Sequence, residues 1–368
     1  MTRVSSPGKL FLSGEWAVLE LGNPGIVAAV NKRVFVEIDK SKEIEISVDD
    51  FGINGIKANF DGKLSFRNAT KEQEDKLVFM RGAIETTLKY LGTWKPFKIH
   101  SWGEMSSAIV DGQQKKIGFG SSAAAVVSTV GAILTFHGMD LDKRDTKDLV
   151  YKLATIAHYF AQGKVGSGFD VAASTYGGIF VYKRFDPKWL VGQMESGKTV
   201  KQVTDSQWPG FMAEQLKIPD DFRLLVAWTK ESASTVNLVK EMDKFKASDP
   251  KEYKRLYDSI ASLVAESIPA WKESDRKKII QNLNRNEKIL RELGQKSNLP
   301  IETGDLRKLS EIAQKNGAGG KLSGAGGGDC GIAVCFDQKT ADKIVQEWKK
   351  AGLYPIDATI DYKGIKAS

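Results

Sequence analysis

The sequence predicts a protein of two domains that combine helices and strands, of the α/β and α+β classes. The chain has 368 residues, and single hydrophobic cores seldom grow beyond roughly 250–300 residues. Alternating apolar residues, typical of strands, occur in the first forty residues and return between long helical segments later. Three glycine-rich loops lie where one element passes into the next. We therefore expect a ligand site built largely from loop backbone.

Composition narrows the class of protein. The chain is 41% hydrophobic and 27% charged, with a net charge of +8 that favours anionic partners. Its basic residues are dispersed and not clustered with aromatic residues, so a nucleic-acid-binding protein is disfavoured. Two cysteines, three histidines and no CxxC or HExxH motif argue against a disulfide framework or a zinc site. With no signal peptide and no run of about 20 apolar residues, we expect a cytoplasmic protein without a membrane partner.

The first segment, residues 1–40, is predicted to form paired strands. Pro7-Gly8 is expected to bend the chain and place Lys9 at the start of a strand, where its ammonium can reach a phosphoryl oxygen. The alternative is a surface lysine in a turn. Short strands continue over 43–66, with hairpin signals at Asn54-Gly55 and Asp61-Gly62.

A helix over 72–91 and a strand over 95–105 lead to the central glycine-serine loop. Gly118 and Gly120 are expected to take positive φ angles, and Ser121 or Ser122 to cap a helix that runs to about Phe136. Unpaired N–H groups and the helix dipole make such a start a phosphate site. The alternative is a capped helix after a tight turn, with no ligand.

The second glycine loop, residues 162–168, follows a helix over 145–160 and leads to Asp170. Asp170 is interpreted either as a helix cap or as a carboxylate held at a phosphate site. A strand is expected over 177–182.

The second half begins with a loop-rich connection over 191–219, which separates an N-terminal domain, 1–190, from a C-terminal domain, 220–368. A strand over 223–228 is followed by a polar turn and a series of amphipathic helices. These helices are expected at 236–247, 250–271, 274–295 and 304–316.

The third glycine stretch spans residues 317–331 and is bounded by a helix and the strand 332–336. A flexible linker would not be bounded so tightly, so we interpret this stretch as backbone that approaches a ligand closely. A helix over 340–350 and a strand over 358–362 end the sequence.

Three motifs, in order, resemble those of the GHMP kinase superfamily (galactokinase, homoserine, mevalonate and phosphomevalonate kinases). They are Pro7-Gly8-Lys9 to Gly14-Glu15, Gly118-Phe119-Gly120-Ser121-Ser122-Ala123-Ala124, and Lys321-Leu322-Ser323-Gly324-Ala325-Gly326-Gly327-Gly328-Asp329-Cys330. Within the superfamily, three segments are similar to the phosphomevalonate kinase family. They are residues 162–173, the segment Trp228-Thr229-Lys230-Glu231, and residues 326–331.

The resemblance implies a GHMP kinase fold. Its N-terminal domain would be ribosomal-protein-S5-like α/β with a left-handed βαβ unit, and its C-terminal domain ferredoxin-like α+β, with the site in the cleft between them. It also implies ATP-dependent, Mg²⁺-dependent phosphorylation of (R)-5-phosphomevalonate to (R)-5-diphosphomevalonate, a step of isoprenoid biosynthesis through mevalonate. ATP and 5-phosphomevalonate are then the partners, with the chain a monomer or a homodimer.

The resemblance also assigns roles to residues. Catalysis is expected from Lys9, as a cation on the transferring phosphoryl group, and from Asp170, as a group that orients Lys9 and the metal more than it removes a proton. Ser122 is the expected Mg²⁺ ligand. The ATP phosphates are assigned to backbone at Gly118, Phe119, Gly120, Ser121, Ser122 and Ala123. Substrate contacts are assigned to Lys9, Gly14, Glu15, Ser167, Asp170, Ser232, Thr235, Gly326 and Gly327.

Some assignments stay open. Lys115, Lys116 and Lys164 are either phosphate partners or solvated lysines. Mevalonate kinases carry a metal-binding glutamate eleven residues before the aspartate, where this chain has Tyr159, so Gln162 or a water is left as the second ligand. The alternatives are another GHMP enzyme, such as mevalonate kinase or diphosphomevalonate decarboxylase, and a non-enzymatic regulator on the same fold. The regulator is expected to have lost Lys9, Ser122 or Asp170, and all three are present.

Overall fold

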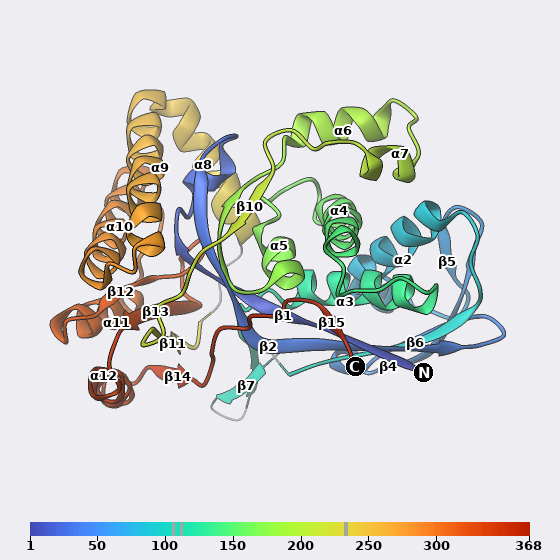
Figure 1. Ribbon diagram of the computed structural model, residues 1–368, viewed down its shortest axis with the longest axis horizontal. Coiled ribbons are helices and arrows are strands. Elements are labelled where there is room, and N and C mark those ends of the chain that lie inside the picture. The colour runs from blue at the N-terminus through green and yellow to red at the C-terminus, as the bar shows by residue number, and fades with distance from the viewer. Residues whose placement is uncertain (105–106, 111–112, 232–234) are drawn as a thin grey trace.

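The structure is a computed structural model that describes residues 1–104, 107–110, 113–231 and 235–368. Its largest element is a nine-stranded sheet (Figure 1). Its strands follow the order β10-β9-β2-β6-β3-β4-β5, with β1 paired to β2 and to β15. All pairs are antiparallel except β3 with β6. The strands are β1 Thr2–Ser13, β2 Pro24–Lys40, β3 Ile44–Val48, β4 Ile53–Phe60, β5 Leu64–Phe66, β6 Phe97–Gly103, β9 Ile179–Lys183, β10 Met212–Gln215 and β15 Lys366–Ala367.

Helices cover one face of this sheet (Figure 1). The central helix, α3, is rich in alanine and valine and is buried along most of its length against β1 and β2. Around it lie α2, α4 and α5, whereas α6 and α7 lie farther from the sheet. The helices are α1 Lys71–Lys76, α2 Val78–Leu91, α3 Ser121–Phe136, α4 Arg144–Ala161, α5 Phe169–Tyr176, α6 Pro187–Glu195 and α7 Val200–Asp205.

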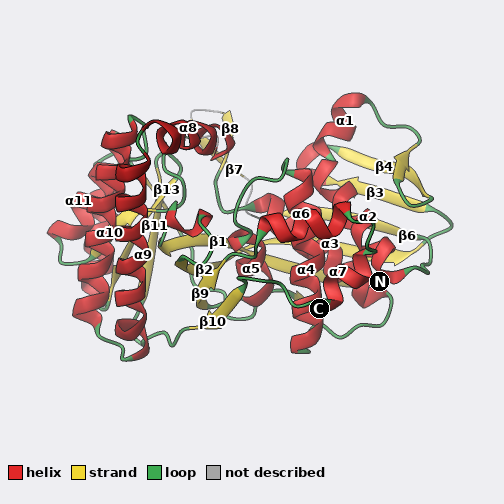
Figure 2. Cartoon of the chain, turned by 90° about the horizontal axis from the view of Figure 1, so that it is seen from above, coloured by secondary structure: helices red, strands yellow, loops and turns green. Residues whose placement is uncertain are grey.

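A second sheet, of four antiparallel strands, has the order β12-β13-β11-β14 and lies beside the long helices α9 and α10 (Figures 1 and 2). Its strands are β11 Arg223–Trp228, β12 Gly319–Leu322, β13 Cys330–Cys335 and β14 Tyr354–Ile356. The helices are α8 Thr235–Ser248, α9 Pro250–Lys272, α10 Arg276–Ser297, α11 Gly304–Lys315 and α12 Gln338–Lys350. A separate hairpin joins β7 Ser107–Val110 and β8 Gln113–Lys116.

One apolar cluster joins the two halves. Leu12 and Ile26 of the first sheet pack in it together with Trp228 and Val264 of the second half. All four side chains are at most 1% exposed, so their burial holds the two halves together with the free energy of hydrophobic packing. The mixed α/β architecture agrees with the fold class expected from the sequence.

The structure corrects several local predictions. Lys9 lies in the interior of β1, because the strand continues through Pro7-Gly8 with only a shift of register. Asn54-Gly55 lies within β4, and the β3–β4 connection is made by the short helical turn Asp49–Phe51 instead. The predicted helix over 72–91 is two helices, divided at Leu77.

The expected domain limits, 1–190 and 220–368, differ from the strand pairing at two places. Segment 191–219 is not only loop, since it contains α7 and β10, and β10 pairs with β9 of the first sheet. The end of the chain does not stay with the second half. Instead of a strand over 358–362, Ile360 forms a single bridge to Val30, and β15 pairs with β1 of the first sheet.

Among the described residues, no helix combines the length and apolarity that crossing a bilayer would require.

Candidate active site

The main cavity of the described chain has a volume of about 530 Å³ and lies where both halves meet. From the first half, its wall includes Lys9 on β1, the turn that follows β1, the start of α3, the end of α4 and the second glycine loop. From the second half come the first turn of α8 and part of the third glycine stretch. The polar lining residues include Lys9, Glu15, Ser121, Ser122, Thr155, His158, Tyr159, Gln162, Ser167, Asp170, Thr235 and Asp329.

Lys9 is held against the glycine-serine loop by its backbone and its side chain. Its N–H donates to the carbonyl oxygen of Phe119 at 2.9 Å, and its ammonium donates to the carbonyl oxygen of Gly118, also at 2.9 Å. Its aliphatic stem lies so close to Gly120 that a Cβ there would meet the Cε and Cγ atoms at 3.0 Å. This packing fixes one positive charge at the start of α3.

Position 118 requires glycine because there is no room for a side chain, and not because of its backbone angle φ. Only Gly120 of the two loop glycines has a positive φ, at 80°. At Gly118 a Cβ would meet the Asp329 carboxylate at 1.5 Å, and the Gly118 N–H donates to Asp329 Oδ1 at 2.8 Å. The second and third motifs therefore meet at this contact, although the two residues are far apart in the sequence.

The start of α3 offers backbone donors but no side-chain cap. Gly120 occupies the N-cap position and Ser121 is the first helical residue, so neither serine caps the helix as predicted. Ser121 and Ser122 line the cavity, whereas Phe119 and Ala123 are buried outside its lining. The N–H of Gly118 is bonded to Asp329 and that of Phe119 to the carbonyl oxygen of Ile117. Among the expected phosphate donors, the first helical N–H groups, from Ser121 onward, remain unpaired by the helix itself.

The Ser122 hydroxyl has a partner that the sequence analysis missed. Its Oγ lies 3.2 Å from Nε2 of His158, a residue of α4 that is buried and stacks on Phe79. Burial lowers the pKa of His158, with the Asp170 carboxylate opposing this more weakly, so the imidazole is neutral. A neutral Nε2 can accept a hydrogen bond from the Ser122 hydroxyl, which leaves the lone pairs of Oγ free to face a cation.

Asp170 lies in the first turn of α5 and lines the cavity. It does not cap that helix, because Gly168 occupies the N-cap, and the Asp170 carboxylate accepts from the N–H of Val171 at 2.9 Å. Within the described residues, Asp170 and Lys9 do not form an ion pair, so Asp170 does not orient Lys9 directly as expected. Ser167 and Thr235 also line the cavity.

Three of the expected substrate contacts, all glycines, have other surroundings. Gly14 is enclosed by Gly25 and Pro24, and Gly326 by the carbonyl oxygen of Ile301, so neither lines the cavity. Gly327 donates its N–H to the same Ile301 oxygen. Ser232 lies outside the described residues.

The structure places the side chain of only one of the three lysines whose role was left open, Lys115, Lys116 and Lys164. The Lys164 ammonium pairs with Glu195 at 3.0 Å on the surface, as a solvated lysine does. Lys115 and Lys116 lie in the backbone of β8, and their side chains are outside the described part of the chain. Of the two candidates for a second metal ligand, Gln162 lines the cavity, and so does Tyr159 in place of the glutamate of mevalonate kinases.

Glu15 reaches the cavity wall but is committed to a buried ion pair. Its carboxylate pairs with the ammonium of Lys321 on β12, and both side chains are almost wholly buried. Beside them, the carboxylate of Glu287 on α10 accepts from the N–H of Leu322 at 2.9 Å. The Lys321 ammonium thus pairs with Glu15, while Glu287 is a second buried carboxylate near it that has no ion-pair partner of its own among the described residues. Burial raises the pKa of Glu287 to about 7, and Lys321 opposes this shift.

Replacing Glu287 by glutamine is expected to increase stability at pH 8 but not near pH 4.5. Between its ordinary pKa of 4.5 and about 7, Glu287 binds a proton in the folded state and not in the unfolded state, so the free energy of unfolding falls as the pH rises. At about 1.4 kcal/mol per pKa unit, ionisation of Glu287 costs on the order of 3 kcal/mol above pH 7. Glutamine keeps the acceptor for Leu322 and leaves Lys321 paired with Glu15. Urea denaturation at both pH values measures the difference.

The matched control for this experiment is Glu266→Gln, which removes an exposed carboxylate of α9 that pairs with Arg285. Its effect is expected to stay within about 1 kcal/mol at both pH values. An effect of Glu287→Gln that is equal at pH 4.5 and pH 8 would contradict the shifted pKa.

Known proteins share this architecture. The family described as "GHMP kinases N terminal domain" matches residues 78–178, and "GHMP kinases C terminal" matches residues 267–353. A phosphomevalonate kinase of Streptomyces sp. (strain CL190) is 31% identical over 370 residues, covering 98% of this chain and 97% of that protein. The structure of Streptococcus pneumoniae phosphomevalonate kinase in complex with phosphomevalonate and AMPPNP is similar with a TM-score of 0.82, at 26% identity and with 98% and 100% of the chains covered. A mevalonate kinase of Thermococcus sibiricus is 27% identical, covering 98% and 97%.

Proposed function

The chain belongs to the GHMP kinase family, and from this premise we propose that it transfers the terminal phosphoryl group of ATP to (R)-5-phosphomevalonate, releasing ADP and (R)-5-diphosphomevalonate. This reaction is a step of the mevalonate route to isoprenoids. The observation that carries the proposal is the likeness to phosphomevalonate kinases over nearly the whole length of this chain and of theirs. The cavity supports it, because all three glycine loops reach or adjoin its wall.

The start of α3 is the proposed binding site for the ATP phosphates. Unpaired N–H groups from Ser121 onward and the positive end of the helix dipole favour phosphate oxygens there. Lys9 adds a full positive charge beside them, held by Gly118 and Phe119. Because phosphoryl transfer depends mainly on positioning and charge neutralisation, this arrangement suits the reaction.

Mg²⁺ fits the oxygen donors that line the cavity, which include the Ser122 hydroxyl and the Asp170 carboxylate. The described residues contain no cluster of three or more histidine, cysteine, aspartate or glutamate side chains that could hold a metal. Mg²⁺ usually takes one or two protein oxygens and completes its shell with phosphates and water, so Ser122 and Asp170 are sufficient protein ligands in this proposal. When bound, the ion neutralises phosphate charge on ATP.

Asp170 is proposed to orient the acceptor or the metal, and not to act as a strong base. The acceptor is a phosphate monoester with a second pKa near 6, so it is mostly a dianion at neutral pH and needs no deprotonation. Both cysteines are buried free thiols, which supports a reducing compartment such as the cytoplasm.

Replacing Asp170 by asparagine is expected to lower kcat by about 10- to 100-fold, the cost of misplacing a reacting group. Asparagine preserves the shape and the acceptor for Val171 but removes the charge. Asp145→Asn is the matched control, since Asp145 is an exposed aspartate in the first turn of α4. Steady-state kinetics at saturating substrates measures the effect, and near-normal kcat in Asp170→Asn would exclude both the orienting and the basic role.

A coupled ADP-release assay tests the function as a whole. The protein is given ATP and Mg²⁺ with 5-phosphomevalonate, mevalonate or 5-diphosphomevalonate in parallel. Turnover with 5-phosphomevalonate alone is expected. Turnover with mevalonate would indicate a mevalonate kinase. The sequence argues against that activity, because Tyr159 occupies the position of the metal-binding glutamate of mevalonate kinases. Turnover with 5-diphosphomevalonate would indicate a decarboxylase.

A further inference from the structure

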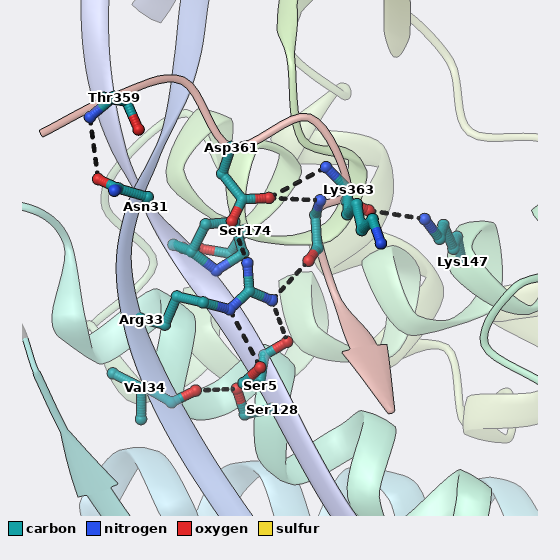
Figure 3. A network of polar contacts seen from close by, with 12 residues as sticks. Ser5, Asn31, Arg33, Val34, Ser128, Lys147, Ser174, Thr359, Asp361 and Lys363 are labelled. Carbon is teal, nitrogen blue, oxygen red and sulfur yellow. Dashed lines mark hydrogen bonds and ion pairs between the residues drawn. The ribbon is translucent and has the colours of Figure 1, made fainter. Parts of the chain in front are cut away.

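The last ten residues, 359–368, form a strap that leaves the second half and lies across the first. Residue Thr359 exchanges hydrogen bonds with Asn31 of β2, and at the far end β15 pairs with β1 (Figure 3). Between these points the strap passes over α5, the helix that carries Asp170. None of the strap residues lines the cavity.

Arg33 of β2 is at the centre of the polar contacts that hold the strap. Its guanidinium forms an ion pair with the carboxylate of Asp361 (Figure 3). The same guanidinium donates to the carbonyl oxygens of Ser5 and Gly364, both at 2.7 Å, and to Ser5 Oγ at 3.0 Å. Arg33 is only 6% exposed, so its charge depends on these partners for solvation.

Asp361 connects the strap to the end of α5. Its backbone oxygen accepts from the N–H of Gly178 at 2.6 Å, and its carboxylate accepts from the N–H groups of Lys363 and Gly364 at 3.0 Å. One residue on, the N–H of Ile365 donates to the carbonyl oxygen of Thr175 in α5 at 3.1 Å.

The backbone of the strap also packs closely against the backbone at the C-terminal end of α5. Gly177 and Gly364 lie back to back, since a Cβ on Gly177 would meet the Gly364 nitrogen at 2.3 Å and one on Gly364 would meet the Thr175 oxygen at 2.3 Å. Lys147 of α4 adds a bond of 2.8 Å from its ammonium to the carbonyl oxygen of Lys363. The strap thus fixes the C-terminal end of α5 to β2, β1 and α4.

The two residues assigned to catalysis lie on the elements that the strap joins. Lys9 is on β1, two residues after Pro7, and the carbonyl oxygen of Pro7 accepts from Ser174 Oγ of α5 at 2.8 Å. Asp170 is four residues before Ser174, one helical turn away. The separation of Lys9 and Asp170 therefore depends on how α5 is set against β1.

We propose that Arg33 and Asp361 are positioning residues of the kinase, which hold α5 against β1 and so set Asp170 relative to Lys9. The inference rests on the proposed function for its effect on turnover. Its structural half, the fixing of α5, does not. Loss of the Asp361 carboxylate leaves the Arg33 charge buried without its ion-pair partner and frees two N–H groups of the strap, so α5 is held less firmly against β1.

Asp361→Ala tests the proposal in the full chain. We expect kcat to fall by about 10-fold or more, while KM for ATP changes little, because Arg33 and Asp361 do not contact the start of α3. Asp361→Asn keeps an acceptor for the N–H groups of Lys363 and Gly364 and is expected to recover part of the loss. In addition, hydrogen exchange without substrate is expected to be faster in the α5 amides of Asp361→Ala.

Glu37→Gln is the matched control, because it breaks the exposed Arg3–Glu37 ion pair between the same strands, β1 and β2. It is expected to change neither kcat nor exchange in α5. If Asp361→Ala does not fold, Lys147→Met removes only the bond to Lys363 and should give a smaller change in the same direction.

Two results would overturn the proposal: unchanged exchange in α5, or faster exchange with normal kcat in protein that is folded at the assay temperature. If the wild-type protein did not use 5-phosphomevalonate, the function would fail, and the exchange measurement would still decide whether the strap fixes α5.

Discussion

Replacing Lys9 by methionine is expected to lower kcat by about 100- to 1,000-fold, the loss typical of removing one preorganised donor from a site of developing charge. Methionine keeps an unbranched stem, so the packing against Gly120 survives while the ammonium and its bond to the Gly118 oxygen are lost. Steady-state kinetics with saturating ATP, Mg²⁺ and 5-phosphomevalonate measures kcat, and circular dichroism checks the fold.

Lys164→Met is the control for this experiment. Lys164 belongs to the loop beside the cavity, but its ammonium pairs with Glu195 at the surface. We expect its removal to change kcat by no more than about twofold, as for an exposed pair. If Lys9→Met kept more than about a tenth of the wild-type kcat, which corresponds to a loss of less than 1.4 kcal/mol of transition-state stabilisation, Lys9 would not be the main protein cation.

Replacing Gly118 by alanine is expected to lower kcat/KM for ATP by about 100-fold, as a small misplacement of a reacting group does. The new Cβ would meet Asp329 Oδ2 at 1.5 Å and Cγ at 2.3 Å, so the carboxylate or the loop must move. Movement of the loop also displaces the Gly118 oxygen that holds the Lys9 ammonium. Kinetics with varied ATP gives the effect on binding and turnover, and thermal denaturation gives the effect on stability.

Gly192→Ala is the matched control for the glycine replacement. It lies in α6, with no atom within 4 Å of a new Cβ and no positive φ, so it should leave kinetics and stability nearly unchanged. The double variant Gly118→Ala/Asp329→Ala removes the clash and should regain stability relative to Gly118→Ala. If it is no more stable, the contact with Asp329 is not what makes glycine necessary at this position.

Local signals predicted the helix that follows the glycine-serine loop. The glycine-serine loop and the alanine run after it predicted a helix to Phe136, and α3 ends there. The order of the three motifs pointed to the GHMP kinase family, to which the chain belongs. The placement of Ser122 and Asp170 on the cavity wall follows the same motifs, since each is in the first turn of a helix that begins at a glycine.

Contacts between distant residues were beyond sequence reasoning. Asp329 meets Gly118 across 211 positions, and Lys321 meets Glu15 across 306. His158 is a buried histidine of α4, and nothing in its neighbourhood in the sequence indicates a partner for Ser122. Substrate roles for Gly14, Gly326 and Gly327 were inferred from motif membership. In the structure, these glycines instead accommodate close backbone packing.

The strap also means that the first sheet cannot be completed until residues 359–368 have been synthesised. β1 is synthesised before β15, and Arg33 precedes its ion-pair partner Asp361 by 328 residues. At typical elongation rates of about 5–20 residues per second, that delay is on the order of 15–65 s. Until then Arg33 lacks its ion-pair partner, and Val4 and Ser5 at the edge of β1 lack the strand that pairs with them. An edge of this kind can pair with foreign strands. Nascent chains in which β1 has emerged and β15 has not are therefore expected to aggregate more readily than chains that contain both strands.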